Sequence, residues 1–323
     1  MPEVPPALLD FIREGKRFLI AGHKDPDGDC VGSQLALASV LRRMGKTAIP
    51  CSAGPFKRSE IQSYEHFFCS APVKEAGDRL IVVDCSNPGR TGDLEPYLEG
   101  LPLAAIDHHE TGNYADHANG VCYTDSEAPS TTVLILRLVR ALGLELNREE
   151  AELLFFGLCT DTGFFRHVDE GGAETFEAAA ALIRAGANPK AAFAAIHGGQ
   201  SFNSRKFLGH ILARAESFFG GKLIVSSEDH AEIRQFGLES RDSDTLYQLL
   251  LSVKAVEAIV ILRQEKAESC TVGLRSRDWV DVGEIAATFG GGGHKNAAGF
   301  TVDGTIAELK PKLVESFVGI FSA

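Results

Sequence analysis

The sequence predicts an α/β protein with two domains: an N-terminal doubly wound, mostly parallel sheet and a smaller C-terminal α/β domain. Three observations predict this fold. The chain has 323 residues, which is long for a single core and sufficient for two. In its first part, short apolar runs typical of buried strands alternate with helical segments, which indicates parallel strands covered on both faces. After a more helical middle, strand-like apolar runs return towards the C-terminus.

The elements of the first domain follow from these patterns. Apolar runs bounded by polar residues predict strands over 17–22, 47–51, 79–84 and 103–106. Apolar residues at helical spacing predict a helix over 30–44, which ends at Gly45. Further helices are expected over 133–142 and 148–159. An alanine-rich helix is expected after the glycine pair 171–172 and ends at residue 183, and a short helix runs from residue 189 to the glycine pair 198–199.

The second domain begins after a connecting segment, for which a helix is expected over 202–219. Strands are expected over 222–226, 258–262 and 269–274. The chain is therefore divided into an N-terminal domain over 1–195, a connecting helix over 196–220 and a C-terminal domain over 221–323.

Acidic and histidine residues follow the predicted strands of the first domain. The first group is the segment His23-Lys24-Asp25-Pro26-Asp27-Gly28-Asp29. Later groups are Asp84, the triplet Asp107-His108-His109, and Asp161 near the end of the helix expected over 148–159. Because ligands of open parallel sheets bind outside the carboxyl ends of the strands, we expect these side chains to converge there.

Several carboxylates and imidazoles at one place predict a centre for two metal ions. Like charges a few ångströms apart raise each other's pKa or need a cation between them. A carboxylate-rich set with some histidine suits Mn²⁺ or Mg²⁺ better than metals that prefer thiolates. Taken singly, each group has a simpler interpretation as a solvated turn or helix-cap residue. Their joint occurrence favours a two-metal hydrolase, in which the cations activate water and polarise the scissile group.

A glycine-rich segment near the C-terminus indicates an anion-binding site. Four consecutive glycines, Gly290 to Gly293, would weaken any helix or strand, so another reason must favour them. Close approach of the backbone to a phosphate is such a reason, with His294 and Lys295 adding positive charge. A flexible hinge is the alternative. Arg275, at the end of the preceding predicted strand, is a candidate for contact with a terminal phosphate or a base.

Composition limits the partners and the location. The net charge is −12, from 32 Lys and Arg against 44 Asp and Glu, which disfavours a protein that tracks long nucleic acid. A small phosphorylated substrate held by a few local cations is compatible with it. The 7 cysteines are scattered and form no CxxC pair, which argues for reduced thiols. The apolar runs are too short to span a bilayer, and the N-terminus lacks a secretory pattern. We therefore expect a cytoplasmic protein without membrane contact.

Together these motifs resemble the DHH phosphoesterase superfamily. The HxDPDGD segment, the strand-end Asp84 and the Asp-His-His triplet look like its metal-binding motifs. The segment GGGGHKNAAG, residues 290–299, resembles the signature of the DHH-associated domain. The resemblance covers essentially the whole chain and implies an active site in the cleft between the two domains. In architecture the chain is similar to stand-alone bacterial oligoribonucleases of the nanoRNase type.

The resemblance also implies roles for matching positions. It implies that His23 and Asp27 bind one Mn²⁺, while Asp84 bridges to a second; Mg²⁺ or Co²⁺ could replace Mn²⁺. The ligands of the second ion would be Asp29, His108 and Asp161. The catalytic residues would be Asp84, Asp25 beside the attacking water, and His109 at the scissile phosphate or leaving oxygen. The substrate clamp would consist of Arg275, Ser276, Gly291, Gly292, Gly293 and His294.

The function implied is hydrolysis of short RNA oligonucleotides to nucleoside monophosphates and removal of the 3′-phosphate of pAp. Long duplex nucleic acid is not an expected partner. Whether the protein forms a homodimer is left open by the sequence. A cyclic di-AMP or linear dinucleotide phosphodiesterase of the same fold is the main alternative. An inorganic pyrophosphatase is disfavoured by the glycine-rich His motif. A nucleotide-binding regulator without catalysis is the alternative from another class.

Overall fold

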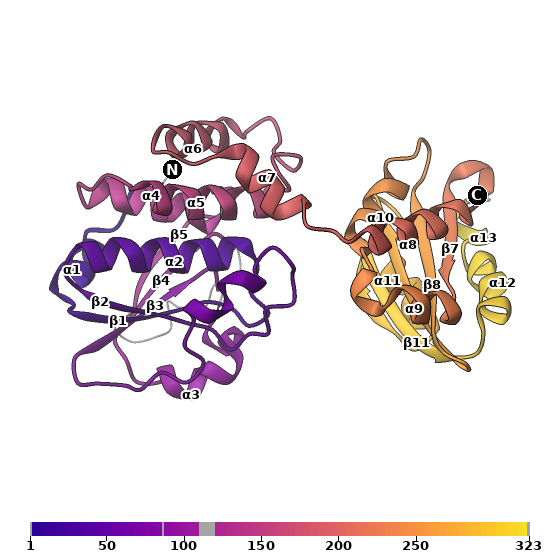
Figure 1. Ribbon diagram of the computed structural model, residues 1–323, viewed down its shortest axis with the longest axis horizontal. Coiled ribbons are helices and arrows are strands. Elements are labelled where there is room, and N and C mark those ends of the chain that lie inside the picture. Colours follow the sequence, from indigo (N-terminus) through magenta and orange to yellow (C-terminus); the bar gives the residue numbers. More distant parts are fainter. Residues whose placement is uncertain (1, 86, 110–119, 322–323) are drawn as a thin grey trace. The chain divides into compact units, whose positions relative to one another are not determined.

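The computed structural model describes residues 2–85, 87–109 and 120–321. The chain forms two compact units, Met1–Gly199 and Gln200–Ala323, joined by one connection (Figure 1). No helix among the described residues is both long and apolar enough to cross a membrane.

The first unit is built on a five-stranded sheet in the order β2-β1-β3-β4-β5, with every neighbouring pair parallel. The strands are β1 (Arg17–Ala21), β2 (Thr47–Cys51), β3 (Asp78–Val83), β4 (Leu103–Asp107) and β5 (Val121–Thr124). From β1 the chain moves outward to β2 and returns to β3 on the other side of β1. The direction of winding therefore switches between β1 and β3, which is where ligands of open α/β sheets bind.

Helices cover both faces of this sheet, so the doubly wound fold is confirmed. Alternate strand residues such as Phe18, Ile81 and Ile106 pack against one helical layer. That layer contains α1 (Pro6–Glu14), α2 (Gly28–Arg43), α4 (Thr131–Ala141), α5 (Arg148–Asp161), α6 (Ala173–Arg184) and α7 (Pro189–His197). The intervening residues face the other side, where the 3₁₀ segment η2 (Pro88–Leu94) and α3 (Glu95–Leu98) cover them (Figure 1).

A close crossing of α2 and α5 brings the start of one helix to the end of the other. A Cβ on Gly157 of α5 would lie 3.0 Å from the carbonyl oxygen of Gly28 and 3.1 Å from Cα of Asp29. A Cβ on Gly28 would lie 2.4 Å from the hydroxyl of Thr160. Because only glycine permits this approach, the two glycines place Asp29 next to Asp161, the last residue of α5.

The second unit contains a six-stranded sheet in the order β10-β11-β9-β8-β7-β6, in which only the β7–β8 pair is parallel. Its strands are β6 (Glu216–Phe218), β7 (Leu223–Glu228), β8 (Ala258–Lys266), β9 (Ser269–Ser276), β10 (Gly292–His294) and β11 (Ala297–Asp303). One face packs on α8 (Phe202–Ala213), α9 (His230–Phe236) and α10 (Ser243–Leu251). The other packs on α11 (Val282–Thr288), α12 (Ile306–Ser316) and α13 (Val318–Phe321).

The structure contains elements that the sequence patterns did not predict, among them α1, β10 and β11, and two further differences have a physical reason. The helix expected over 202–219 ends at Ala213, and Glu216–Phe218 form the edge strand β6. Phe207 and Ile211 of α8 are buried in the core of the second unit, so the segment packs into this unit and does not span between the two. The strand β5 was not expected, because it has 4 residues and only Tyr123 is buried.

Candidate metal centre

The predicted metal ligands lie together at the carboxyl ends of the central strands. His23 follows β1, Asp84 follows β3, and His108 follows β4. The helices that flank the switch point supply the remaining carboxylates: Asp27 and Asp29 from the start of α2, and Asp161 from the end of α5.

Asp84 lies at the centre of this cluster and contacts both halves of it. Its Oδ2 lies 3.5 Å from Nε2 of His23, and its Oδ1 lies 3.6 Å from Nε2 of His108. The residue is 3 % exposed and has a φ of 51°, which non-glycine residues seldom adopt. The surrounding fold thus holds a strained backbone that directs one oxygen to each histidine.

One half of the cluster consists of His23 and Asp27 beside Asp84. Nε2 of His23 lies 3.7 Å from Oδ2 of Asp27. Its Nδ1 lies 2.8 Å from the carbonyl oxygen of Lys24, so Nδ1–H donates there and Nε2 faces the carboxylates. Oδ1 of Asp27 accepts a hydrogen bond from the Cys30 amide as the cap of α2, which leaves Oδ2 directed into the cluster.

The other half consists of Asp29, His108 and Asp161. Nε2 of His108 lies 3.9 Å from Oδ2 of Asp29 and 3.6 Å from Oδ2 of Asp161. Its Nδ1 lies 3.3 Å from the carbonyl oxygen of Ala128, which again orients Nε2 towards the acids. Asp29 accepts backbone hydrogen bonds from Thr131 at 2.7 Å and Thr132 at 3.0 Å.

The electrostatics of the cluster fit a centre that takes cations. Burial, together with the charges of Asp84, Asp161 and Asp27, raises the pKa of Asp29 well above its usual range. Burial raises the pKa of Asp161 to about 6 against the opposing effect of His108. Burial lowers the pKa of His23, but the carboxylates of Asp27 and Asp84 outweigh it and raise that pKa to about 10. Without cations, protons must therefore offset the crowded negative charge, and cation binding would release them.

The donor set favours hard divalent cations. The groups Asp84–His108–His109 and Asp29–His108–Asp161 each present ligand atoms within 4.8 Å of one another. Oxygen and imidazole donors of this kind suit Mn²⁺ or Mg²⁺. Cys30 also lies within reach of His23 and Asp84. Burial raises the pKa of its thiol well above the ordinary value, and the thiol donates to Oε1 of Gln34, so it is a poor ligand.

The two other catalytic candidates differ in their surroundings. Nδ1 of His109 lies 2.7 Å from Oδ1 of Asp107 and 3.7 Å from Oδ1 of Asp84, so His109 borders the cluster. Hydrogen bonding to Asp107 raises the pKa of His109. The carboxylate of Asp25 instead forms a 2.6 Å ion pair with Lys57, which lowers its pKa.

The predicted clamp residues lie in the second unit, and Arg275 is the one best placed for a ligand. Its guanidinium stacks over the ring of Tyr247 at 4.7 Å. Both residues line a cavity of about 460 Å³. Ser276 is instead buried: its hydroxyl donates to the Val280 carbonyl at 2.7 Å and accepts from Asn296 at 3.1 Å. These contacts are structural and occupy the hydroxyl.

The glycine run folds as part of a hairpin, which gives a reason for its glycines besides the expected approach of a phosphate and the alternative of a flexible hinge. Gly292–His294 form β10, which pairs with β11. A Cβ on Gly291 would lie 2.4 Å from the carbonyl oxygen of Gly299. Gly293 has a φ of 147°, and a Cβ there would lie 2.5 Å from the carbonyl oxygen of Ala297. Packing of the hairpin itself therefore requires these two glycines, while Gly292 and His294 are exposed.

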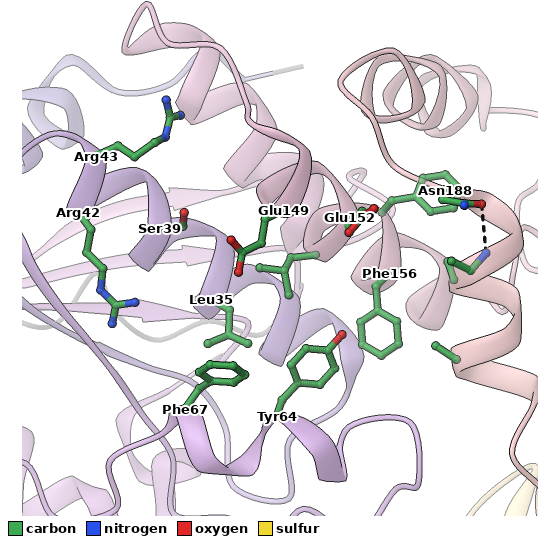
Figure 2. Close-up of a pocket in the computed structure, with 15 residues that line it drawn as sticks. Leu35, Ser39, Arg42, Arg43, Tyr64, Phe67, Glu149, Glu152, Phe156 and Asn188 are labelled. Carbon is green, nitrogen blue, oxygen red and sulfur yellow. Dashed lines mark hydrogen bonds between the residues drawn. The ribbon is translucent and has the colours of Figure 1, made fainter.

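The structure adds a residue that the sequence did not single out: the buried Thr131, whose backbone and hydroxyl contact two of the acids. The sequence signal is the segment Pro129-Ser130-Thr131-Thr132, a pattern typical of a helix start before the helix expected over 133–142, but it does not show what the helix start contacts. A separate cavity of about 650 Å³ lies between α2, α5, α7 and the 3₁₀ segment η1 (Gln62–Phe67). Figure 2 shows Tyr64, Phe67 and Phe156 along its wall, and the described residues that line it include none of the metal-ligand candidates.

Both units of this chain match domains of known protein families. Residues 17–158 match the DHH family, N-terminal domain, and residues 220–323 match the DHHA1 domain. The chain is 31% identical to the bifunctional oligoribonuclease and PAP phosphatase NrnA of Thermus thermophilus, over 88% of this chain and 84% of that protein. It is 26% identical to the cyclic-di-AMP phosphodiesterase GdpP of Geobacillus thermodenitrificans, over 98% of this chain and 49% of that protein.

A solved structure shares the fold over the full length. The exopolyphosphatase-related protein from Bacteroides fragilis has a TM-score of 0.80 and 20% identity, with 100% of both chains covered. Both domain families match, the identity to NrnA extends over most of both proteins, and the acids and histidines converge at one site. The chain therefore belongs to the DHH family of phosphoesterases, with an N-terminal DHH domain and a C-terminal DHHA1 domain.

Proposed function

We propose that this phosphoesterase depends on Mn²⁺, hydrolyses short RNA oligonucleotides to nucleoside monophosphates and removes the 3′-phosphate of pAp. The observation that carries the proposal is the position of Asp84, whose two oxygens face two histidines in separate halves of one acidic cluster. The identity to NrnA from Thermus thermophilus supports the choice of substrates.

The proposed ligands of one cation are His23, Asp27 and Asp84, and those of the other are Asp84, Asp29, His108 and Asp161. When bound, such cations acidify water and offset negative charge on phosphoryl oxygens. The protein's own contribution is to hold these donors in place before the substrate arrives: both histidines are fixed through Nδ1, and Asp27 and Asp29 accept backbone amides.

His109 is the proposed proton donor to the leaving oxygen. It borders the cluster. Whereas His23 and His108 donate Nδ1–H to backbone carbonyls, His109 donates Nδ1–H to the buried carboxylate of Asp107. A carboxylate in this position orients the ring, stabilises its protonated form and leaves Nε2–H free for substrate. Asp25 remains a proposed catalytic residue, and its ion pair with Lys57 keeps it negatively charged.

In the second unit, Arg275 and His294 are proposed to bind substrate phosphate. Arg275 is held by the Tyr247 ring and donates to the Leu274 carbonyl through Nη1, so its other donors can reach a ligand. His294 lies opposite Ala297, which in turn pairs with Arg275. Because residues directly opposite in antiparallel pairs share a face, His294 and Arg275 lie on the same face of the sheet.

A cyclic di-AMP phosphodiesterase is the second candidate, because GdpP matches 98% of this chain. Turnover of pAp, diribonucleotides and cyclic di-AMP should be compared in parallel with purified, metal-stripped protein to which Mn²⁺ is added back. We expect pAp and the diribonucleotide to be hydrolysed with the higher kcat/KM. Preference for cyclic di-AMP would favour the second candidate, and no Mn²⁺-dependent turnover at all would favour a nucleotide-binding regulator.

Substrate length provides a second test. The net charge of −12 repels a polyanion beyond the local cations, so kcat/KM should fall as the RNA is lengthened from two residues to tens. Added salt should reduce this discrimination, since it screens charges over a distance of about 10 Å. Equal or better cleavage of long single strands would contradict the proposed preference for short RNA.

A further inference from the structure

The helix α4 begins at the metal centre, and its first residue contacts two of the proposed ligands. Thr131 is fully buried. Its backbone N–H donates to Oδ2 of Asp29 at 2.7 Å, and its hydroxyl donates to Oδ1 of Asp84 at 3.1 Å. One threonine therefore joins a ligand from α2 to the ligand that follows β3.

The backbone contact follows from the needs of the helix end. The first amides of any helix lack partners within it. In α4 the cap residue Ser130 makes no side-chain cap bond, because its hydroxyl pairs with that of Thr132 at 2.6 Å. Asp29 takes over this role and accepts from the amides of Thr131 and Thr132. This contact uses only backbone atoms of Thr131 and survives substitution of its side chain.

The hydroxyl contact distinguishes the two halves of the centre. Oδ2 of Asp84 faces His23, whereas Oδ1 faces His108. Thr131 donates to Oδ1. Its hydroxyl therefore acts on the side of Asp84 that belongs with Asp29, His108 and Asp161.

We propose that Thr131 is a positioning residue that sets the cation affinity of one half of the centre, the half formed by Asp29, His108 and Asp161. The hydroxyl uses one lone pair of Oδ1 and fixes the carboxylate plane, which would leave the other lone pair of Oδ1 available to a cation. The half formed by His23 and Asp27 uses Oδ2 and does not depend on this hydrogen bond. This inference rests on the two-cation assignment made above.

The test is to replace Thr131 with valine, which keeps its shape and removes the hydroxyl, and with serine, which keeps the hydroxyl. Metal-stripped proteins are titrated with Mn²⁺ by calorimetry. We expect wild type to bind Mn²⁺ at two sites. Thr131→Val should weaken one site about 10-fold or more, as for other residues that orient metal ligands, and leave the second unchanged. Thr131→Ser should bind like wild type.

Electron paramagnetic resonance identifies the affected half. At two equivalents of Mn²⁺, wild type and Thr131→Ser should show the signal of a magnetically coupled pair, and Thr131→Val the signal of isolated ions. Asp161→Ala removes a ligand from the same half and should resemble Thr131→Val. His23→Ala removes a ligand from the opposite half, so combining it with Thr131→Val should weaken the site that remains.

Thr175→Val is the matched control. Thr175 is a buried threonine in the first turn of α6, and it is not among the proposed ligands or their partners. Melting of the metal-free variants checks that α4 is intact. If Thr131→Val binds two Mn²⁺ like wild type, if serine fails to restore affinity, or if both sites weaken equally, the proposed role is wrong. If wild type itself binds no Mn²⁺, the two-cation assignment falls together with this role.

Discussion

The imidazole Nδ1 of His109 lies 2.7 Å from Oδ1 of Asp107, the fully buried residue that ends β4. The same oxygen also accepts the backbone N–H of His109 at 3.2 Å. The last residue of the strand thus fixes both the backbone and the ring of the residue proposed to donate a proton.

Replacing Asp107 with asparagine should therefore impair the chemical step more than binding. Asparagine keeps the shape but removes the charge, and its amide can turn an N–H towards Nδ1 and favour the wrong tautomer. We expect kcat to fall at least about 10-fold, with KM and Mn²⁺ content close to wild type. Steady-state kinetics and metal analysis of the purified variant check this. Unchanged kcat would show that His109 needs no orienting acid.

Asp84→Asn should abolish turnover because it weakens the ligand shared by both halves of the centre. In the metal-free protein the same change should leave the melting temperature equal or higher, since it removes one of several mutually repelling carboxylates. Activity assays and thermal melts with and without Mn²⁺ measure both effects. Near-wild-type activity with full metal content would refute the bridging role of Asp84.

The clamp residues should affect nucleotide substrates selectively. Arg275→Ala and His294→Ala should lose most activity on pAp and diribonucleotides but retain much of it on bis-p-nitrophenyl phosphate, which offers no distant phosphate to hold. Arg277→Ala is the control, because the Arg277 guanidinium is exposed and donates to the Leu251 carbonyl. Equal losses on both kinds of substrate would assign Arg275 and His294 to the fold or the metal centre.

Two adjacent glycines should respond differently to alanine. A Cβ on Gly291 would lie 2.3 Å from Cβ of Phe300, whereas nothing lies within 4 Å of a Cβ on Gly292. We expect Gly291→Ala to destabilise the second unit by about 1–3 kcal/mol, and Gly292→Ala to change its stability by less than about 1 kcal/mol. Denaturation followed by fluorescence of Trp279, the only tryptophan, reports on this unit. Similar losses for both variants would contradict the hairpin packing.

Asp242 should make the stability of the second unit depend on pH. Its burial opposes ionisation, but hydrogen bonds from Arg205 and the Thr245 amide outweigh this and lower its pKa. A lowered folded pKa means that the stabilisation is present above the unfolded value of about 3.9 and is lost as pH falls through the folded value. Asp242→Asn keeps the helix cap but loses the charge beside Arg205, so it should cost roughly 0.2–1 kcal/mol at pH 7 and progressively less below pH 4. A pH-independent cost, measured by urea denaturation, would exclude this linkage.

The sequence by itself predicted which acidic and histidine side chains gather at one edge of the sheet, and it fixed the order in which they occur. Strand-like runs ending in His23, Asp84 and Asp107 predicted the parallel sheet, and parallel strands bring their carboxyl ends to one edge whatever the details of packing. The groups that contain the six proposed ligands could therefore be expected to converge, and the resemblance to the DHH superfamily implied which residues of each group bind the cations. Local patterns also located α2 and α5 to within two residues at each end.

Only the tertiary structure decided how these groups act on one another. It directs the two oxygens of Asp84 to different histidines and places Thr131 against one of them. It also pairs Asp25 with Lys57 and uses Gly291 in hairpin packing. The physical reason is that these contacts join residues distant in sequence, and the orientation of each side chain depends on what the completed fold packs around it. Residue types and spacing predict convergence, but rotamers and hydrogen-bond partners arise from packing alone.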